Sequence, residues 1–456
     1  MLVNRPRYLS KLLAFRDTNL IKVVTGVRRS GKSCLLELAA ESLRKEGIGE
    51  SQILSLNLES MNVTIADGRE LYDYFHERLS SSKRSYIFID EVQRVPGWEQ
   101  AINAMRVDFD CDIYVTGSNA FLFSSSLATY ISGRYVEVKV QPLAFSEYLD
   151  FCSVTVPNSE LQKGIAYGKG GEALSLDALI DRYCQFGGMP QIANLELLQS
   201  EHEDYMQSLY DSVVIRDISD REHSISRRAL GNLDLLRRLC VFLADNVGNS
   251  TSATNIANAI TSAGERTTNK TISDYLQALV EAYLFYPVQR FDIRGKDTLR
   301  TNPKYYIVDA GIRSFLMGYR NADRGRVFEN IVYQQLVYEG YSVHVGKLYQ
   351  REVDFVAQKD GKMIYIQVAE QMFTDDTQHR ELTPLLSIKD AHEKWVIVRQ
   401  GSYPADIDGV KIVPAADFLL STDYLYKRAV RASRDSFEAA LAQVPDVEPD
   451  GYDSRD

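Results

Sequence analysis

The apolar positions in the first part of the chain follow two alternating patterns, short runs of strand type and longer stretches of helical type. Apolar and β-branched runs at residues 20–25 and 86–89, with a further expected strand at 52–60, are typical of buried parallel strands. Between residues 35 and 43 the apolar positions recur at helical spacing. We therefore expect residues 1–150 to form an α/β domain around a parallel sheet.

The loop between the first strand and the first long helix carries the strongest chemical signal. It reads GVRRSGKS and fits the pattern G-x-x-x-x-G-K-[ST] at every fixed position. In such a P-loop NTPase, backbone N–H groups and the helix N-terminus face the phosphates. The lysine adds a point charge and the hydroxyl ligates Mg²⁺, so ATP and Mg²⁺ are the expected cofactors. The predicted nucleotide-binding residues are Gly26, Val27, Arg28, Arg29, Ser30, Gly31, Lys32, Ser33 and Cys34.

Polar residues at the ends of later strands complete an expected hydrolytic site. Asp90 and Glu91 follow the run at 86–89, and ligands bind at the carboxyl ends of strands in open α/β sheets. Asp90 is expected to hold Mg²⁺ through water, and Glu91 to orient and activate the attacking water. Asn119 or Ser118, after the next strand, is a candidate sensor of the γ-phosphate, although a helix N-cap explains both equally well.

Four segments together resemble one protein family. They are KVVTGVRRSGKSCLL, YIFIDEVQ, DIYVTGSNAFLFSSSLATYISGRYVEVKVQPLAFSEYL and GGMPQ. The set resembles the bacterial and archaeal AAA-type ATPases that end in a nuclease-like domain of unassigned function, and the resemblance covers residues 8–425. It implies an AAA+ ATPase core, and it implies that Arg134 reaches a γ-phosphate, in its own subunit or in that of a neighbour in a homo-oligomer. A surface ion pair is the alternative role for Arg134.

The middle of the chain changes character twice. Residues 151–215 combine a glycine-rich polar stretch with helical periodicity, and the resemblance implies a helical lid and connector there. Residues 216–304 give a helix, a short helix, a third helix from about residue 268 to 279, and a hairpin at 293–299. This order is typical of a winged helix-turn-helix, whose third helix enters a DNA major groove while the wing contacts the backbone.

Charge leaves the partner of this winged-helix region open. The whole chain has a net charge of -10, which argues against binding nucleic acid through bulk charge. Residues 216–304 nevertheless hold 13 lysine and arginine residues against 10 acidic ones, a local balance of +3. Duplex DNA is one candidate partner, with Asn269, Lys270, Arg294 and Lys296 as the expected contacts. A protein partner is the alternative, because winged helices also serve as interaction modules.

Residues 305–426 have the acidic spacing of a PD-(D/E)xK nuclease, a restriction-endonuclease-like α/β fold, without its lysine. Glu329 lies on an expected helix and Asp354 on an expected strand, and Gln367 replaces the second strand acid. In this fold the acids hold Mg²⁺ and the lysine stabilises developing phosphorane charge. Ala369 stands at the lysine position, and losing one such stabiliser typically costs on the order of 10²–10³ in rate. We expect a nuclease-like domain that has lost its activity.

Composition restricts the remaining possibilities. The five cysteines are scattered, which excludes a disulfide framework and fits reducing cytoplasm. No apolar run approaches the roughly 20 residues that cross a bilayer, so no membrane contact is expected. The acidic tail at 427–456 is expected to be disordered. The sequence thus predicts a cytoplasmic ATP-hydrolysing AAA+ protein whose nucleotide state controls a DNA-contacting module. The alternatives are a slow ATPase switch that recruits a protein, and an ATP-dependent nuclease.

Overall fold

The N-terminal part of the chain forms a parallel sheet, as the sequence predicts. The computed structural model describes residues 3–79, 83–118, 133–161, 163–193, 199–213, 218, 232–264, 266–318 and 323–420. In this described part the first sheet has five strands in the order β2-β3-β4-β1-β5. The strands are β1 (Ile21–Thr25), β2 (Ile53–Asn57), β3 (Ser85–Asp90), β4 (Cys111–Gly117) and β5 (Tyr135–Lys139). Every residue of β1, β3 and β4 is buried, because helices cover both faces of the sheet.

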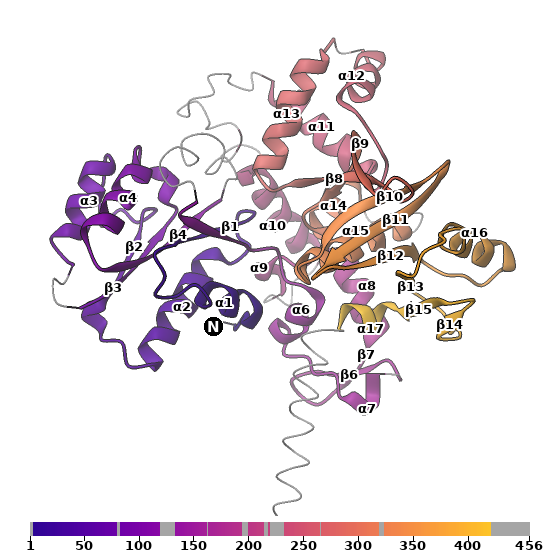
Figure 1. The fold of residues 1–456 in the computed structure, drawn as a ribbon, viewed down its shortest axis with the longest axis horizontal. Coiled ribbons are helices and arrows are strands. Elements are labelled where there is room, and N and C mark those ends of the chain that lie inside the picture. Colours follow the sequence, from indigo (N-terminus) through magenta and orange to yellow (C-terminus); the bar gives the residue numbers. More distant parts are fainter. Residues whose placement is uncertain are drawn as a thin grey trace, which may run out of the picture.

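Two pairs of helices cover the two faces of this sheet (Figure 1). The helices are α1 (Pro6–Leu13), α2 (Lys32–Lys45), α3 (Gly68–His76) and α4 (Trp98–Asp108), with short 3-10 turns η1 (Glu50–Gln52) and η2 (Val92–Arg94). One apolar core joins α1 and α2 to one face of the sheet, and a second core joins α3 and α4 to the other face. The result is a three-layer α/β/α domain, which leaves the carboxyl edge of the strands open for the loops that follow them.

The segment expected to be a helical lid contains helices and one small hairpin. Its elements are α6 (Phe145–Phe151), α7 (Asn158–Leu161), β6 (Ile165–Tyr167), β7 (Ala173–Ser175), α8 (Leu176–Phe186), α9 (Pro190–Ala193) and α10 (Gln199–Asp211). Helix α6 begins before residue 151, so the change from sheet to helices comes earlier than expected. The antiparallel β6–β7 hairpin was not predicted. The role of these helices as a lid stays a prediction.

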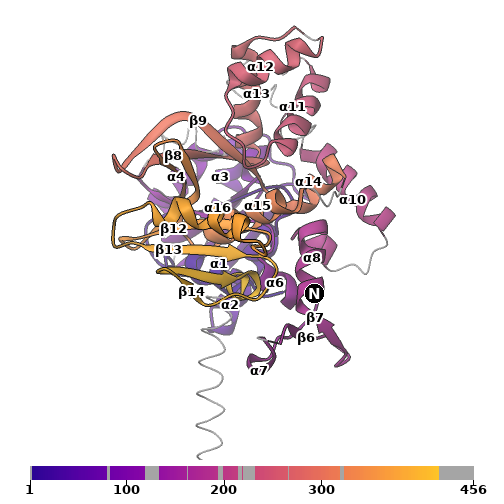
Figure 2. The same ribbon diagram turned by 90° about the vertical axis from the view of Figure 1, so that its right-hand side faces the viewer.

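Three further helices project away from the body of the molecule (Figure 2). They are α11 (Leu233–Asp245), α12 (Ala253–Ser262) and α13 (Asn269–Glu281). Each begins at a polar N-cap, and the side chains of Asn232, Ser252 and Thr268 accept a hydrogen bond from a backbone N–H of the first turn. Helix α13 leads into the hairpin of β8 (Phe285–Asp292) and β9 (Asp297–Ile307). This is the order of elements that the sequence predicts for a winged helix, although that identity remains an interpretation.

The C-terminal part is built on a second, mixed sheet of eight strands within the described residues, in the order β14-β15-β13-β12-β11-β10-β8-β9. Its other strands are β10 (Ser342–Leu348), β11 (Arg351–Lys359), β12 (Lys362–Ala369), β13 (Glu393–Val398), β14 (Asp406–Ile407) and β15 (Val410–Pro414). Its helices are α14 (Ala310–Met317), α15 (Arg324–Tyr338), α16 (Asp375–Leu386) and α17 (Ala415–Leu419). Among the described helices, none is both long and apolar enough to cross a membrane.

The expected wing is an edge of this second sheet rather than a separate hairpin. Strand β8 pairs with β9 on one side and, in parallel, with β10 on the other. The expected domain boundary after residue 304 therefore falls inside β9 and has to be corrected. The local pattern at residues 285–307 shows two strands and a turn, but it does not show that β8 pairs with a strand about fifty residues later. The expected tail at 427–456 lies outside the described residues.

Candidate nucleotide-binding site

The phosphate loop joins the carboxyl end of β1 to the amino end of α2, where the sequence predicts it. Gly26 and Gly31 have φ angles of 138° and 95°, which favour glycine. A Cβ on Gly26 would lie 2.0 Å from the carbonyl oxygen of Val140. The Lys32 ammonium donates to the carbonyl oxygens of Gly26 and Val27, at 3.1 Å each. This turn is of the kind in which backbone N–H groups converge on a phosphate.

Two arginines of the loop contact neighbouring parts of the chain. The Arg28 guanidinium donates to the Glu59 carboxylate at 3.0 Å, in the loop after β2. The Arg29 guanidinium lies 5.5 Å from the ring centre of Tyr205 on α10. The phosphate loop is thus in contact with both the parallel-sheet domain and the helices expected to form the lid.

The oxygens expected to hold Mg²⁺ lie beside the first turn of α2. Ser33 and Cys34 are exposed in that turn. Asp90 ends β3 at the carboxyl edge of the parallel sheet, the edge at which β1 leads into the phosphate loop and the start of α2. A hydroxyl and a carboxylate at the phosphate end of α2 fit a magnesium ion, which usually keeps water and takes few protein oxygens.

Asp90 and Glu91 form the second half of the site at the carboxyl end of β3. The Asp90 carboxylate accepts a hydrogen bond from the Thr116 hydroxyl on β4 and one from the Asn57 amide, the latter at 3.2 Å. Glu91 adopts a φ of 56°, which is uncommon for a residue with a side chain. Its backbone N–H donates to the Thr116 hydroxyl at 2.8 Å. One threonine therefore orients both acids of the expected hydrolytic site.

Sequence reasoning missed the residue that holds the Glu91 side chain. The Gln93 amide donates to Glu91 Oε2, and the Ser118 hydroxyl lies 3.4 Å from the same oxygen. The amide of Gln93 also contacts Ser118 Oγ at 3.3 Å. Ser118, one of the two sensor candidates, is thus in the site, while Asn119 lies outside the described residues. The available signal is the position of Gln93, an amide side chain two residues after Glu91, in η2.

Arg134 is not at the phosphate loop of its own chain. It precedes β5, and β5 runs parallel to β1 with Lys139 opposite Thr25. Arg134 therefore lies at the amino end of the sheet, about 16 Å along the strand from the edge that carries the loop. Its exposed guanidinium donates to the Asn103 side chain at 3.3 Å. Of the two sites left open for Arg134, this position disfavours the phosphate loop of its own chain, and a role in a neighbouring subunit stays a prediction.

Comparison with known proteins identifies the domain that carries this site. A curated Haemophilus influenzae relative, described as an uncharacterized protein, is 38% identical over 421 residues, which cover 92% of this chain and 99% of the relative. The model of the family "AAA domain" matches residues 18–149. The chain contains an AAA domain and belongs to the family of this Haemophilus influenzae protein. The matched residues contain the phosphate loop and the Asp90–Glu91 pair, so the P-loop NTPase core of the AAA domain is confirmed.

Further matches cover the C-terminal part or most of this AAA protein. Models of two domains of unknown function, DUF8612 and DUF4143, match residues 177–323 and 324–418. The uncharacterized protein MJ1544 of Methanocaldococcus jannaschii is 27% identical and covers 80% of this chain and 77% of its own length. The solved Walker-type ATPase PABY2304 of Pyrococcus abyssi is 14% identical, with a TM-score of 0.43, over 69% of this chain and 95% of that one.

A second polar cluster lies in the C-terminal sheet of the AAA protein, around the expected nuclease-like residues. The Glu329 carboxylate accepts from the Tyr306 hydroxyl at 2.7 Å and from the Lys304 ammonium at 3.4 Å. The same ammonium lies 2.7 Å from the Glu352 carboxylate, and Lys304 is 3% exposed. Strand β9 thus supplies a lysine to these acids, although the usual lysine position holds Ala369. No local sequence pattern indicates that Lys304 contacts these acids, because the contact depends on the pairing of β8 with β10, which lies far along the chain.

Asp354 and Gln367 belong to the same cluster. The Asp354 carboxylate accepts from the Val368 backbone N–H at 2.8 Å, and the Gln367 oxygen accepts from the Asp354 N–H at 3.3 Å. Burial and then the neighbouring Glu329 carboxylate raise the pKa of Asp354 well above its ordinary value. Within the part of the chain that the structure describes, no three acidic, histidine or cysteine side chains are arranged to hold a metal ion.

The expected DNA contacts lie on two separate elements. Lys270 is exposed in the first turn of α13, and the Asn269 amide donates to the Thr254 hydroxyl on α12 at 3.0 Å. Arg294 and Lys296 are exposed in the β8–β9 turn. All four contacts stay predictions, because nothing in their geometry distinguishes a nucleic-acid partner from a protein.

Proposed function

We propose that this AAA protein binds ATP with Mg²⁺ and hydrolyses it. The observation that carries the proposal is the fixed Glu91 carboxylate, held by Gln93 and Ser118 at the strand edge from which the phosphate loop also emerges. Such a carboxylate is suited to orienting water and accepting its proton. The glycine-dependent loop supplies the complementary phosphate cradle.

In this mechanism the backbone N–H groups and Lys32 bind the β- and γ-phosphates, while Ser33 and Asp90 would hold the metal. Mg²⁺, when bound, neutralises charge that builds on the transferred phosphoryl group. Glu91 accepts a proton from water as the water oxygen attacks the γ-phosphorus, and the bond to the ADP oxygen breaks. The products are ADP and inorganic phosphate. Thr116 keeps Asp90 and Glu91 in one arrangement during this displacement.

Phosphate release by a Glu91→Gln variant tests this proposal. The substitution removes the base and keeps the size of the side chain, so turnover should fall about 100-fold while ATP binding is retained. Glu77→Gln, which changes an exposed carboxylate outside the site, is the matched control and should turn over ATP like the unmodified chain. Normal turnover by Glu91→Gln would overturn the assignment of the base.

We also propose that nucleotide occupancy is transmitted to the C-terminal part through the strand ends next to the loop. The Thr25 hydroxyl, immediately before the loop, donates to the Glu137 carboxylate at 2.5 Å. The Tyr283 hydroxyl contacts the same carboxylate at 3.3 Å. The Lys139 ammonium lies 4.8 and 4.3 Å from the ring centres of Tyr283 and Tyr286. A change at the loop therefore has a direct path to the hairpin that follows α13.

The partner that we propose for the controlled module is duplex DNA. The support is the exposed Lys270 on α13 together with Arg294 and Lys296 in the β8–β9 turn. A specific observation favours the second candidate, a protein partner: the exposed side of α13 also carries Asp274, one turn after Lys270, which opposes a phosphate backbone.

A mobility shift on duplex DNA at increasing salt separates the two candidates. Binding through lysine and arginine should weaken as salt rises, and Lys270→Gln should weaken it further at every salt concentration. Lys169→Gln, an exposed lysine in the β6–β7 turn, is the matched control. No shift at low salt would reject DNA and leave the protein partner.

We propose that the nuclease-like cluster does not cut nucleic acid. Lys304 already compensates the charge of Glu329 and Glu352. The raised pKa of Asp354 favours the protonated carboxyl, which is a poor metal ligand. The alternative of an ATP-dependent nuclease would require cleavage with Mg²⁺ or Mn²⁺ that Asp354→Ala abolishes.

A further inference from the structure

A buried arginine joins the phosphate loop to two other elements. Arg5 immediately precedes α1 and is 4% exposed. Its Nη1 donates to the carbonyl oxygen of Ser30 at 2.9 Å, and its Nη2 donates to the carbonyl oxygen of Gln141 at 3.0 Å. Its Nε and Nη2 also bind both carboxylate oxygens of Glu147, at 3.0 and 2.7 Å. One planar guanidinium therefore holds the loop, the segment after β5 and the first turn of α6.

The contact with Ser30 determines how the loop presents its backbone. In a planar trans peptide the C=O of one residue and the N–H of the next point in opposite directions. Because the Ser30 carbonyl points to Arg5 behind the loop, the N–H of Gly31 points to the opposite side, where the phosphates are expected. The Gly31 φ of 95° shows that the chain turns at this peptide.

The residue type suits this role. A guanidinium can donate several hydrogen bonds in one plane, whereas the lysine ammonium is a compact charge on a flexible stem. Taking the Arg5 charge out of water is compensated by the two-point contact with the buried Glu147 carboxylate. Such a fixed group keeps the loop in its binding conformation before nucleotide arrives, which lowers the entropic cost of binding.

We propose that Arg5 is a positioning residue that keeps the phosphate loop ready for nucleotide and joins it to the start of α6. This proposal rests on the ATPase function proposed above. Arg5 acts on nucleotide affinity through Ser30, and it does not contact Glu91 or Asp90. Losing it should therefore raise the KM for ATP and leave kcat nearly unchanged.

Steady-state ATP hydrolysis by an Arg5→Lys variant tests the proposal. We expect the KM for ATP to rise about tenfold, since a hydrogen bond from a charged donor is lost, with kcat within twofold of the original. Glu147→Gln keeps Arg5 but weakens the group that orients it, and should raise KM by a smaller factor. Arg7→Lys is the matched control: Arg7 lies in the first turn of α1, two residues after Arg5, and binds Glu339 at 3.1 Å. The KM of this variant should be unchanged.

Two outcomes would overturn the proposal. One is an unchanged KM in both Arg5→Lys and Glu147→Gln. The other is a fall in kcat at constant KM that follows the loss of folded protein, which is what a purely structural role predicts. Absence of ATP hydrolysis in the unmodified chain would instead reject the proposed function itself, so the two failures are distinguishable.

Discussion

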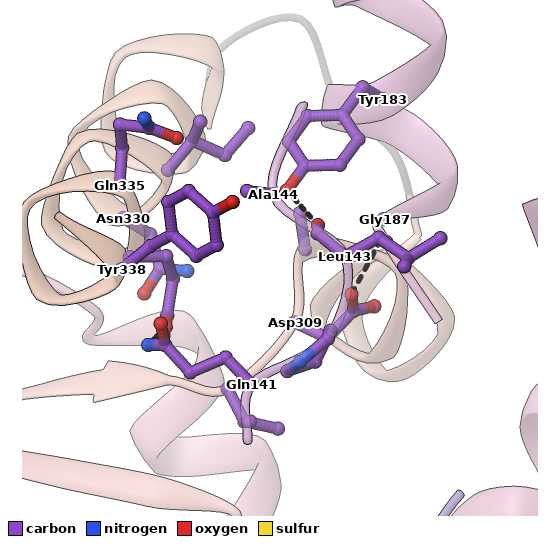
Figure 3. A pocket seen from close by; sticks show the side chains of 15 residues that line it. Gln141, Leu143, Ala144, Tyr183, Gly187, Asp309, Asn330, Gln335 and Tyr338 are labelled. Atoms are coloured by element: carbon purple, nitrogen blue, oxygen red, sulfur yellow. Dashed lines mark hydrogen bonds between the residues drawn. The ribbon is translucent and has the colours of Figure 1, made fainter. Parts of the chain in front are cut away.

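A buried carboxylate between the turn after α8 and the C-terminal part should make stability depend on pH. Asp309 caps α14: its Oδ1 accepts from the N–H groups of Gly311 and Ile312 at 2.8 and 3.3 Å. Its Oδ2 accepts from the Gly188 N–H at 2.7 Å, which joins α14 to the turn after α8. Figure 3 shows Asp309 beside Gly187 in this junction. Burial raises the pKa of Asp309 from 3.8 to about 6, although the three N–H groups oppose the shift.

The sign of the effect follows from this raised pKa. Between pH 3.8 and 6 the folded chain binds a proton at Asp309 that the unfolded chain has lost. The contribution of this group to stability is therefore complete below the unfolded pKa and is lost as the pH rises through the folded pKa. At pH 5, one unit below the folded value, the contribution amounts to about 1.4 kcal/mol relative to pH 7 or above.

Thermal unfolding of the original chain and of Asp309→Asn between pH 5 and pH 8 measures the effect. The side chain of the variant cannot titrate. Its NH2 group stands where Oδ2 accepts from the Gly188 N–H, so that hydrogen bond is lost at every pH. On lowering the pH from 7 to 5, the melting temperature of the original chain should rise relative to that of the variant by about 1–2 °C. The other titrating groups are common to both proteins and cancel in the difference. Parallel pH profiles would refute the reasoning.

Three other substitutions have defined outcomes. Gly26→Ala should lower ATP affinity by more than about tenfold in a direct titration, because its Cβ would lie 2.0 Å from the Val140 carbonyl oxygen; unchanged affinity would contradict the loop geometry. Gln93→Ala should lower kcat about tenfold with ATP affinity intact, because it releases Glu91; an unchanged kcat would reject this role. Lys304→Met should lower the free energy of unfolding by about 2 kcal/mol, because it leaves the partly buried Glu329 and Glu352 without their cation. Neither that variant nor the original chain should cut DNA with Mg²⁺ or Mn²⁺, and cleavage by either would restore the nuclease hypothesis.

The parts of this molecule that the sequence predicts correctly depend on neighbours in the chain. The strand at 20–25, the loop after it and the acid pair at 90–91 each follow from a local pattern of apolar runs, glycines and charges. The parallel order of the strands allows the further expectation that Asp90 and the loop share one edge of the sheet. The same reasoning extends to Ser118, which follows a strand next to β1.

The parts that the sequence does not predict depend on pairing between distant segments. Lys304 reaches Glu329 only because β8 pairs with β10, and no local pattern records that pairing. The resemblance singles out Arg134, but its distance from the loop depends on β5 running parallel to β1, which places Arg134 at the opposite edge of the sheet. No local pattern indicates the role of Arg5, because its partners lie 25 or more positions away. In each case the missing information is the register between elements rather than the type of element.

Calorimetric titration of the folded chain with ATP in the presence of Mg²⁺ tests the central claim, that residues 26–33 and the acid pair at 90–91 form a nucleotide site. The account predicts saturable binding at one site per chain, lost in Lys32→Ala and kept in Glu91→Gln. No heat from the unmodified chain, or undiminished binding by Lys32→Ala, would contradict it.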